Sequence, residues 1–263
     1  MIVMKFGGTS VEDARAIERA AEIVHSRLAQ HPVVVVSAMA KVTDGLLACA
    51  RAAGSGDRQK AVELSRALRE RHYNVAGELL GTGVFTQFHS QLEAEFDSLD
   101  ELLRGVSAVG ELTPRTLDNV ASYGERISST IVTAAFSTRK LPSELVDSRE
   151  VIITNNRYTQ AIPLFDEIND ALAARVKPLL DNGSVPVMGG FIGATKDGTP
   201  TTIGRGGSDF TAAIVGAGLG ASVIEIWTDV NGMMTTDPNI SPDARRIKVI
   251  SFEDAAELAY FGA

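Results

Sequence analysis

The feature that most limits the possible folds is a strand–helix–strand arrangement at the start of the chain. Ile2–Phe6 is a short apolar segment, two glycines interrupt it, and a helix is predicted over residues 10–30. Pro32 then precedes the aliphatic run VVVVSA, which is typical of a strand buried on both faces. Two strands connected through a helix run parallel, because a tight hairpin cannot join them. The sequence therefore predicts a parallel sheet covered by helices.

The rest of the chain alternates in the same way. Ser10, with Asp13 three residues later, is predicted to cap the first helix. Residues 57–138 are predicted to be mostly helical, and Pro114 fits the first position of one of these helices. Further elements are predicted as strands at 144–146, 151–153, 185–192, 201–203 and 223–227, and as helices at 165–180, 208–219 and 252–260.

Composition limits the class of protein. The chain has 263 residues, enough for one large α/β domain or two small ones, and its net charge is −8. We expect no nucleic-acid partner, because basic patches are absent, and any anion site must be positive locally. Cys49 is the only cysteine, so we expect a reducing cytoplasm. Lys5 interrupts any secretion signal, and the longest aliphatic run, residues 33–36, is too short to span a membrane.

The first candidate site is Lys5-Phe6-Gly7-Gly8-Thr9-Ser10, between the first strand and the first helix. Glycines at such a turn allow backbone N–H groups to approach an anion, and a helix N-terminus adds positive potential. Lys5 supplies a full positive charge beside this turn. The spacing matches neither a P-loop nor a dinucleotide fingerprint. On spacing alone, a plain β–α turn remains the alternative.

The second candidate site is Gly204-Arg205-Gly206-Gly207-Ser208-Asp209, which repeats this logic. Arginine can hold a carboxylate or a phosphate through two parallel hydrogen bonds. Asp209 is interpreted either as a helix cap or as a group that orients a lysine or a metal ion. Two glycine-rich anion loops in one sheet favour a transfer reaction, because such a reaction needs a donor site and an acceptor site.

Other motifs carry weaker signals. Asp229-Val230-Asn231-Gly232 is partly similar to a calcium loop but lacks its spacing and final glutamate, so a turn is the simpler interpretation. No pair among the four histidines has metal-ligand spacing, and no nucleophile elbow occurs.

Taken together, the motifs resemble the aspartokinases of the amino acid kinase superfamily. The matching segments follow the family order and span the chain: KFGGTS (5–10), SAMAKVTDGL (37–46), SYGER (122–126), GGFIG (189–193), TTIGRGGSDFTA (201–212), WTDVNGMMTTDP (227–238) and ELAYFGA (257–263). The resemblance implies a three-layer α/β/α sandwich with a mostly parallel central sheet. It implies one catalytic domain over 1–263, in which 1–200, with the helical segment 57–138, binds aspartate and 201–263 binds nucleotide.

The resemblance also implies roles for single residues. Lys5 and Asp209 would be catalytic, the lysine on the transferring phosphoryl group and the aspartate organising lysine and solvated magnesium. Gly7, Gly8, Thr9 and Ser10 would form the phosphate loop. Arg205 would bind the α-carboxylate of aspartate and Glu125 its α-ammonium group. The remaining aspartate-binding residues would be Ser37, Thr43, Phe191 and Ser208, and Lys5, Thr228, Asp229, Met234 and Asn239 would contact the nucleotide.

The implied reaction is phosphoryl transfer from Mg-ATP to L-aspartate, the first step towards lysine, threonine and methionine. No general base is required, because the acceptor carboxylate is already ionised at pH 7. Met234 and Asn239 stand where relatives often have an aromatic residue and an arginine. Relatives also continue into regulatory ACT domains, so we expect a piece of a longer polypeptide. We also expect a homo-oligomer. The alternatives are a kinase for another small acid, such as glutamate, and a ligand-binding domain without turnover.

Overall fold

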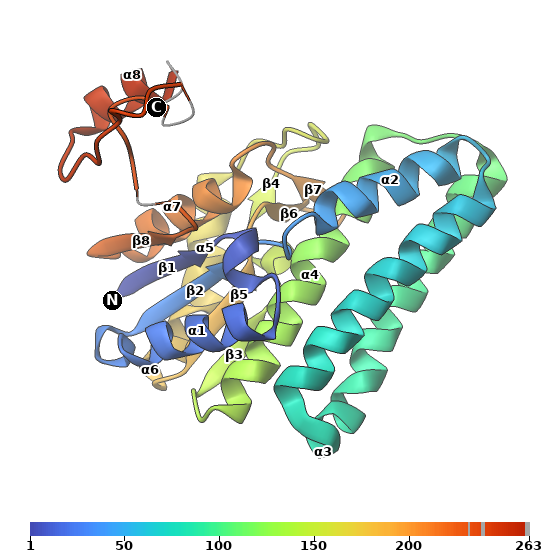
Figure 1. Ribbon diagram of the computed structural model, residues 1–263, viewed down its shortest axis with the longest axis horizontal. Coiled ribbons are helices and arrows are strands. Elements are labelled where there is room, and N and C mark those ends of the chain that lie inside the picture. The colour runs from blue at the N-terminus through green and yellow to red at the C-terminus, as the bar shows by residue number, and fades with distance from the viewer. Residues whose placement is uncertain (231, 238–239, 261–263) are drawn as a thin grey trace. The chain divides into compact units, whose positions relative to one another are not determined.

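The predicted strand–helix–strand arrangement is confirmed in the computed structural model, which describes residues 1–230, 232–237 and 240–260 (Figure 1). Strand β1 (Ile2–Phe6) pairs in parallel with β2 (Pro32–Val36), and α1 (Ala14–His25) connects them. Three more strands extend this sheet in the order β3-β5-β2-β1-β8, with every adjacent pair parallel. They are β3 (Ser143–Val146), β5 (Val185–Gly189) and β8 (Val223–Trp227).

Helices cover both faces of this sheet. Ile2, Met4 and Phe6 belong to a core shared with the first four helices, whereas Val3 belongs to a second core on the opposite face. This division follows from the period of two along a strand. The first group of helices is α1, α2 (Val42–Gly54), α3 (Arg58–Val109) and α4 (Pro114–Thr138). The second is α5 (Phe165–Arg175), α6 (Lys177–Asp181) and α7 (Gly207–Leu219). The predicted three-layer α/β/α sandwich with a mostly parallel sheet is therefore confirmed.

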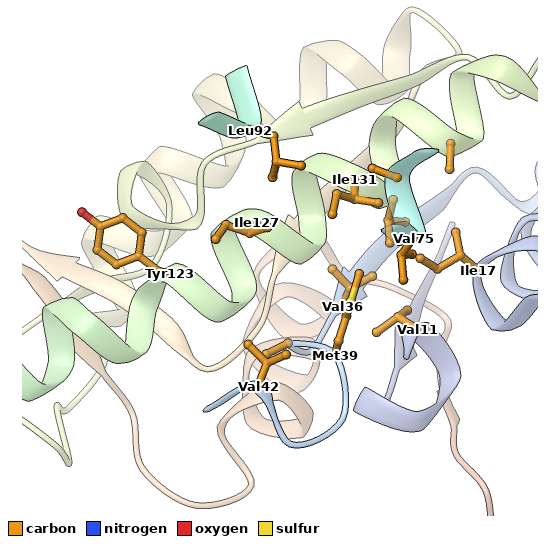
Figure 2. Close-up of a cluster of buried hydrophobic side chains, with 14 of the residues drawn as sticks. Val11, Ile17, Val36, Met39, Val42, Val75, Leu92, Tyr123, Ile127 and Ile131 are labelled. Atoms are coloured by element: carbon orange, nitrogen blue, oxygen red, sulfur yellow. The ribbon is translucent and has the colours of Figure 1, made fainter. Parts of the chain in front are cut away.

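The first core joins distant segments of the chain. Figure 2 shows Val36 and Met39 from the β2 region beside Val11 and Ile17, with Ile131 of α4 nearby. All five side chains are buried. Packing of this kind fixes α4 against the central sheet, and α4 carries one of the predicted site residues.

The helical segment predicted at 57–138 is largely confirmed. Thr113 caps α4 by accepting a hydrogen bond from the Thr116 backbone at 3.1 Å, and Pro114 occupies the first helical position as predicted. Gly81, with φ 66°, divides α3 into two helices, because this backbone conformation is incompatible with a continuous helix. Helix α2 is not among the predicted elements.

A three-stranded sheet corrects one predicted strand. The segment 185–192 is two strands, β5 and β6 (Ile192–Thr195), which lie in different sheets. Phe191 separates them with φ 63°, a left-handed conformation that turns the chain. In the smaller sheet β6 pairs in parallel with β4 (Ile153–Thr154) and antiparallel with β7 (Pro200–Thr202).

The boundaries of two helices also differ from prediction. Asp13, and not Ser10, caps α1, by accepting a hydrogen bond from the Ala16 backbone at 2.7 Å. The preceding residues, Gly8–Val11, form a short 3₁₀ helix, and α1 ends at His25. The helix predicted at 165–180 is interrupted at Val176, which separates α5 from α6.

The chain divides into two compact units, Met1–Trp227 and Thr228–Ala263. The second unit contains α8 (Phe252–Tyr260), as predicted, and an isolated antiparallel bridge between Met234 and Arg246. Across the described ranges, no helix combines the length and the apolar character needed to cross a bilayer.

Candidate active site

A pocket of about 310 Å³ lies at the carboxyl ends of β1, β2 and β5. Ligands of open α/β sheets generally bind at this edge. The structure brings together here all eight residues predicted to be catalytic or aspartate-binding. The pocket is lined by Lys5, Ser37, Ala38, Thr43, Glu125, Phe191, Gly204, Arg205, Gly206, Gly207, Ser208 and Asp209.

Lys5 and Asp209 form an ion pair in this pocket, with 2.7 Å between Nζ and Oδ1. Lys5 alternates with the apolar residues Met4 and Phe6 along β1, so it lies on the same face as Val3, the face that α7 covers. Asp209 stands in the first turn of α7, where the helix dipole favours a negative charge. The lysine is almost fully buried whereas the aspartate is half-exposed. The pair therefore holds a cation at the pocket wall, with its carboxylate partner open to solvent.

Glu125 is the most perturbed acid of the pocket. It lies on α4, is 3% exposed, and its Oε1 accepts a hydrogen bond from the Ala38 backbone at 3.1 Å. Its Oε2 is buried and finds no hydrogen-bond partner in the described part of the chain. Burial raises the pKa of Glu125 to about 8, although the Ala38 hydrogen bond acts in the opposite direction. A buried acceptor without a partner is costly, so this oxygen marks a place for a donor from a ligand.

Arg205 supplies a second positive charge. It is exposed and lies between Gly204 and Gly206, whose φ values of 84° and 71° are left-handed. Among the described residues, Arg205 forms no ion pair or hydrogen bond, so its guanidinium group is free to bind an anion. With Glu125 largely protonated at pH 7, the pocket holds two cationic side chains, Lys5 and Arg205, and one other acidic side chain, Asp209. The pocket is thus locally positive in a chain of net charge −8.

Two adjacent glycines allow the elements around the pocket to approach closely. A Cβ at Gly189 would lie 2.9 Å from the Glu125 Cβ, and one at Gly190 would lie 2.6 Å from the Ser208 Cβ. Phe191 follows in its left-handed conformation, and its N–H donates to Thr211 Oγ1 at 3.0 Å. A non-glycine residue in this conformation is often found at a functional site.

The first predicted loop, Gly7, Gly8, Thr9 and Ser10, lies next to this pocket and does not line it. A Cβ at Gly7 would be 3.6 Å from Lys5 Nζ, which places the loop beside the ammonium group. The Gly7 N–H donates to the Trp227 carbonyl at 3.1 Å. A Cβ at Gly8 would lie only 2.9 Å from the Ala38 carbonyl oxygen, so this position requires glycine to pack against the loop after β2.

The remaining predicted nucleotide contacts belong to the second unit. Thr228 and Asp229 begin this unit, and the Thr228 hydroxyl donates to Asp229 Oδ1 at 3.1 Å. Met234 takes part in the bridge to Arg246. Asn239 lies outside the described residues. In the described ranges, no group of three or more acidic, histidine or cysteine side chains is arranged to hold a metal ion.

Two residues that support the site are missing from the sequence-based predictions. Arg71 of α3 donates to the Ala40 carbonyl at 2.7 Å and to the Glu12 carbonyl at 3.1 Å, so it connects the loops after β1 and β2. Asp118 of α4 is a buried carboxylate. Arg71 carries no sequence signal, because it is one of many charged residues on a long helix. The signal at Asp118 is an acid seven residues before Glu125, on the same helix face.

Comparison with known proteins agrees with this geometry. The model of the amino acid kinase family matches residues 1–263, and the chain belongs to this family. The chain is 38% identical to aspartokinase 2, chloroplastic, of Arabidopsis thaliana, over 99% of its own length and 48% of the relative's. It is 35% identical to lysine-sensitive aspartokinase 3 of Escherichia coli (strain K12), over 100% of its own length and 56% of the relative's.

A solved structure is similar in fold as well. The crystal structure of E. coli aspartokinase III in complex with aspartate and ADP has a TM-score of 0.90 and 35% identity, over 100% of this chain and 57% of that chain. The chain thus spans about half the length of the relatives it matches.

Proposed function

We propose that this chain is an aspartate kinase catalytic domain, which transfers the γ-phosphoryl group of ATP to the β-carboxylate of L-aspartate. The products are ADP and 4-phospho-L-aspartate. The observation that carries the proposal is the buried Oε2 of Glu125, which has no hydrogen-bond partner among the described residues. It belongs to the same pocket as Arg205 and the Lys5–Asp209 pair. The named relatives are aspartokinases, and the E. coli enzyme was crystallised with aspartate and ADP.

The pocket offers a partner for each group of the amino acid. Glu125 Oε2 accepts a hydrogen bond from the α-ammonium group, which also compensates the buried charge of the glutamate. Arg205 binds the α-carboxylate through its planar guanidinium group. Ser37, Thr43, Phe191 and Ser208 complete the walls. With both α-groups fixed, the length of the side chain determines where the reacting carboxylate lies.

The chemistry requires positioning and cations more than proton transfer. A β-carboxylate oxygen forms a bond to the γ-phosphorus while the bond from that phosphorus to the β,γ-bridging oxygen breaks, and the electron pair leaves with ADP. The acceptor is already an anion, so no base is needed. The Lys5 ammonium group, beside the Gly7–Ser10 loop, stabilises charge on the transferring phosphoryl oxygens, and Asp209 holds the lysine in place.

The donor set fits Mg²⁺ held mainly by its nucleotide. Asp209 is a half-exposed carboxylate in the pocket, whereas Glu125 is buried. Mg²⁺ in kinases usually binds one or two carboxylates and completes its shell with phosphate oxygens and water. When bound, the ion would neutralise phosphate charge, and Asp209 would orient its hydration shell.

The proposal extends to the nucleotide and to the setting of the reaction. Thr228, Asp229, Met234 and Asn239 contact ATP, so 201–263 forms the nucleotide-binding part and 1–200 the aspartate-binding part. The reaction takes place in the cytoplasm, supplies lysine and threonine synthesis, and is carried out by a homo-oligomer. A second candidate, a kinase for glutamate, keeps the same α-group contacts and differs only in side-chain length.

A hydroxamate assay with Mg-ATP tests the proposal, because hydroxylamine traps acyl phosphates. Aspartate should support turnover, and glutamate should be poorer by roughly 10- to 200-fold in kcat/KM, the usual effect of one methylene group. Equal kcat/KM values for both amino acids would contradict the assignment. Calorimetric binding of aspartate without turnover would instead identify a ligand-binding domain.

A further inference from the structure

A second buried carboxylate lies on the helix that carries Glu125. Asp118 is 1% exposed and accepts hydrogen bonds from the Thr159 N–H at 2.8 Å, the Thr202 N–H at 3.0 Å and the Thr202 hydroxyl at 2.7 Å. The first two reach Oδ2 and the third reaches Oδ1, so both carboxylate oxygens are used. Asp118 lines no part of the pocket described above, and the proposed chemistry does not use it.

The positions of Asp118 and Glu125 on α4 are related. They are seven residues apart, which is about two helical turns, so both side chains leave the same face of the helix about 10 Å apart along its axis. Glu125 faces the pocket and Asp118 faces β7. Helix α4 therefore carries both Glu125, which lines the amino-acid site, and Asp118, which contacts the strand leading to Arg205.

The partners of Asp118 lie directly under the Arg205 loop. Thr202 is the last residue of β7, three residues before Arg205. Thr159 adopts a left-handed conformation with φ 71°, and its carbonyl oxygen lies 3.5 Å from where a Cβ of Gly204 would be. Asp118 thus binds both the strand that leads into the loop and the turn on which Gly204 rests.

We propose that Asp118 is a positioning residue that sets the separation between Glu125 and Arg205, and through it the enzyme's selectivity for the amino acid. This inference rests on the proposed function, in which these two residues bind the α-ammonium and α-carboxylate groups. Because α4 positions both Glu125 and Arg205, the two α-groups of the amino acid are held at a fixed separation. The reacting carboxylate then reaches the phosphoryl group only when the side chain has one particular length. A displacement of about 1 Å in such an arrangement can lower the rate by about a hundredfold.

Two substitutions at Asp118 separate positioning from simple stability. Asp118→Asn keeps an oxygen for the two N–H groups, and its amide can donate to the Thr202 hydroxyl, which then accepts. Asp118→Leu is similar in size but provides no acceptor. Asp170→Leu, at an exposed site on α5, is the matched control for the same change.

The expected result concerns the amino acid and not the nucleotide. We expect Asp118→Leu to raise the KM for aspartate about 10- to 100-fold, in line with a small misplacement of an anchor. The KM for ATP should stay within about threefold, and the preference for aspartate over glutamate should fall by about tenfold or more, because the anchors belong only to the amino-acid site. Asp118→Asn and the Asp170→Leu control should retain the wild-type values of all three quantities.

Thr202→Val is the second variant, in case Asp118→Leu does not fold. It removes one of the three hydrogen bonds and keeps the shape, so the KM for aspartate should rise by a smaller factor. Hydrogen exchange gives a readout without turnover: the Thr159 and Thr202 amides should lose protection in Asp118→Leu and keep it in Asp118→Asn.

The inference would be overturned if these amides lost protection while the KM for aspartate and the selectivity remained unchanged. It would also be overturned if ATP and aspartate were affected equally. A wild-type protein that does not use aspartate would contradict the proposed function first. Aspartate turnover by the wild type is therefore measured before any variant. Hydrogen exchange of the wild type and the Asp118 variants then tests separately whether Asp118 holds Thr159 and Thr202.

Discussion

Replacing Glu125 with glutamine should stabilise the ligand-free protein increasingly as the pH rises. Burial raises the pKa of Glu125 from its ordinary value of 4.5 to about 8. An acid with a raised pKa favours the folded state when it is protonated. Its contribution is therefore complete below pH 4.5 and is lost as the pH rises through 8. Glutamine is neutral at every pH and has no such dependence.

The size of the effect follows from the shift. Each unit of pKa difference corresponds to about 1.4 kcal/mol. At pH 7 the contribution of Glu125 to the free energy of unfolding of the wild type is therefore about 3 kcal/mol lower than under strongly acidic conditions. Between pH 5 and pH 7 the difference between Glu125→Gln and the wild type should grow by roughly 2–3 kcal/mol. The other charged groups of the pocket, Lys5, Arg205 and Asp209, are the same in both proteins and cancel in the comparison.

Urea unfolding at pH 5, 6, 7 and 8 measures this difference directly. Bound aspartate should shift Glu125 from its protonated to its ionised form, because the α-ammonium group of aspartate favours the ionised carboxylate. Binding near pH 6.5 should therefore release a proton, and the wild-type KM for aspartate should fall by up to about tenfold per pH unit between 6 and 8. Calorimetry in two buffers of different ionisation enthalpy counts that proton. A stability difference that is constant with pH, together with no proton release, would refute the reasoning.

Other variants test the rest of the site. Lys5→Ala should lower kcat by roughly a hundredfold or more, with a smaller effect on aspartate binding, since its charge acts on the transition state; near-normal kcat would exclude this role. Arg205→Lys should mainly raise the KM for aspartate, because the planar fork is lost; a rise for ATP alone would assign the arginine to the nucleotide. Gly190→Ala should reduce the free energy of unfolding by about 1–3 kcal/mol in urea, because the new Cβ meets α7. Arg71→Met should cost about 1.5–3 kcal/mol, whereas the exposed Arg66→Met should cost little; equal losses would remove any special role for Arg71.

Much of the fold can be predicted from the sequence because its signals are local. The aliphatic run after Pro32 is typical of a strand buried on both faces, and the helix before it favours a parallel partner strand. Thr113 and Pro114 mark a helix start through the geometry of their own backbone. The two glycine-rich loops likewise predict where anions bind, because each stands between a strand and a helix. These features need no information about distant residues.

Tertiary contacts decided the remaining features. Ser10 and Asp13 are both able to cap a helix, and Asp13 does so because Gly8 packs against the loop after β2, which holds Gly8–Val11 in a 3₁₀ turn. The strand predicted at 185–192 divides because Gly190 must pass close to α7 and Phe191 then turns into another sheet.

The chemistry of the site shows the same division. Its residue types could be predicted from motifs, but not the unpartnered oxygen of Glu125 or the three bonds to Asp118. A motif records which residues are neighbours along the chain. The burial and pKa of Glu125 and the support of the Arg205 loop depend on contacts between residues far apart in sequence. Ala38 and Glu125 are 87 residues apart, and Asp118 and Thr202 are 84 residues apart, so each pair becomes neighbours only when the chain folds.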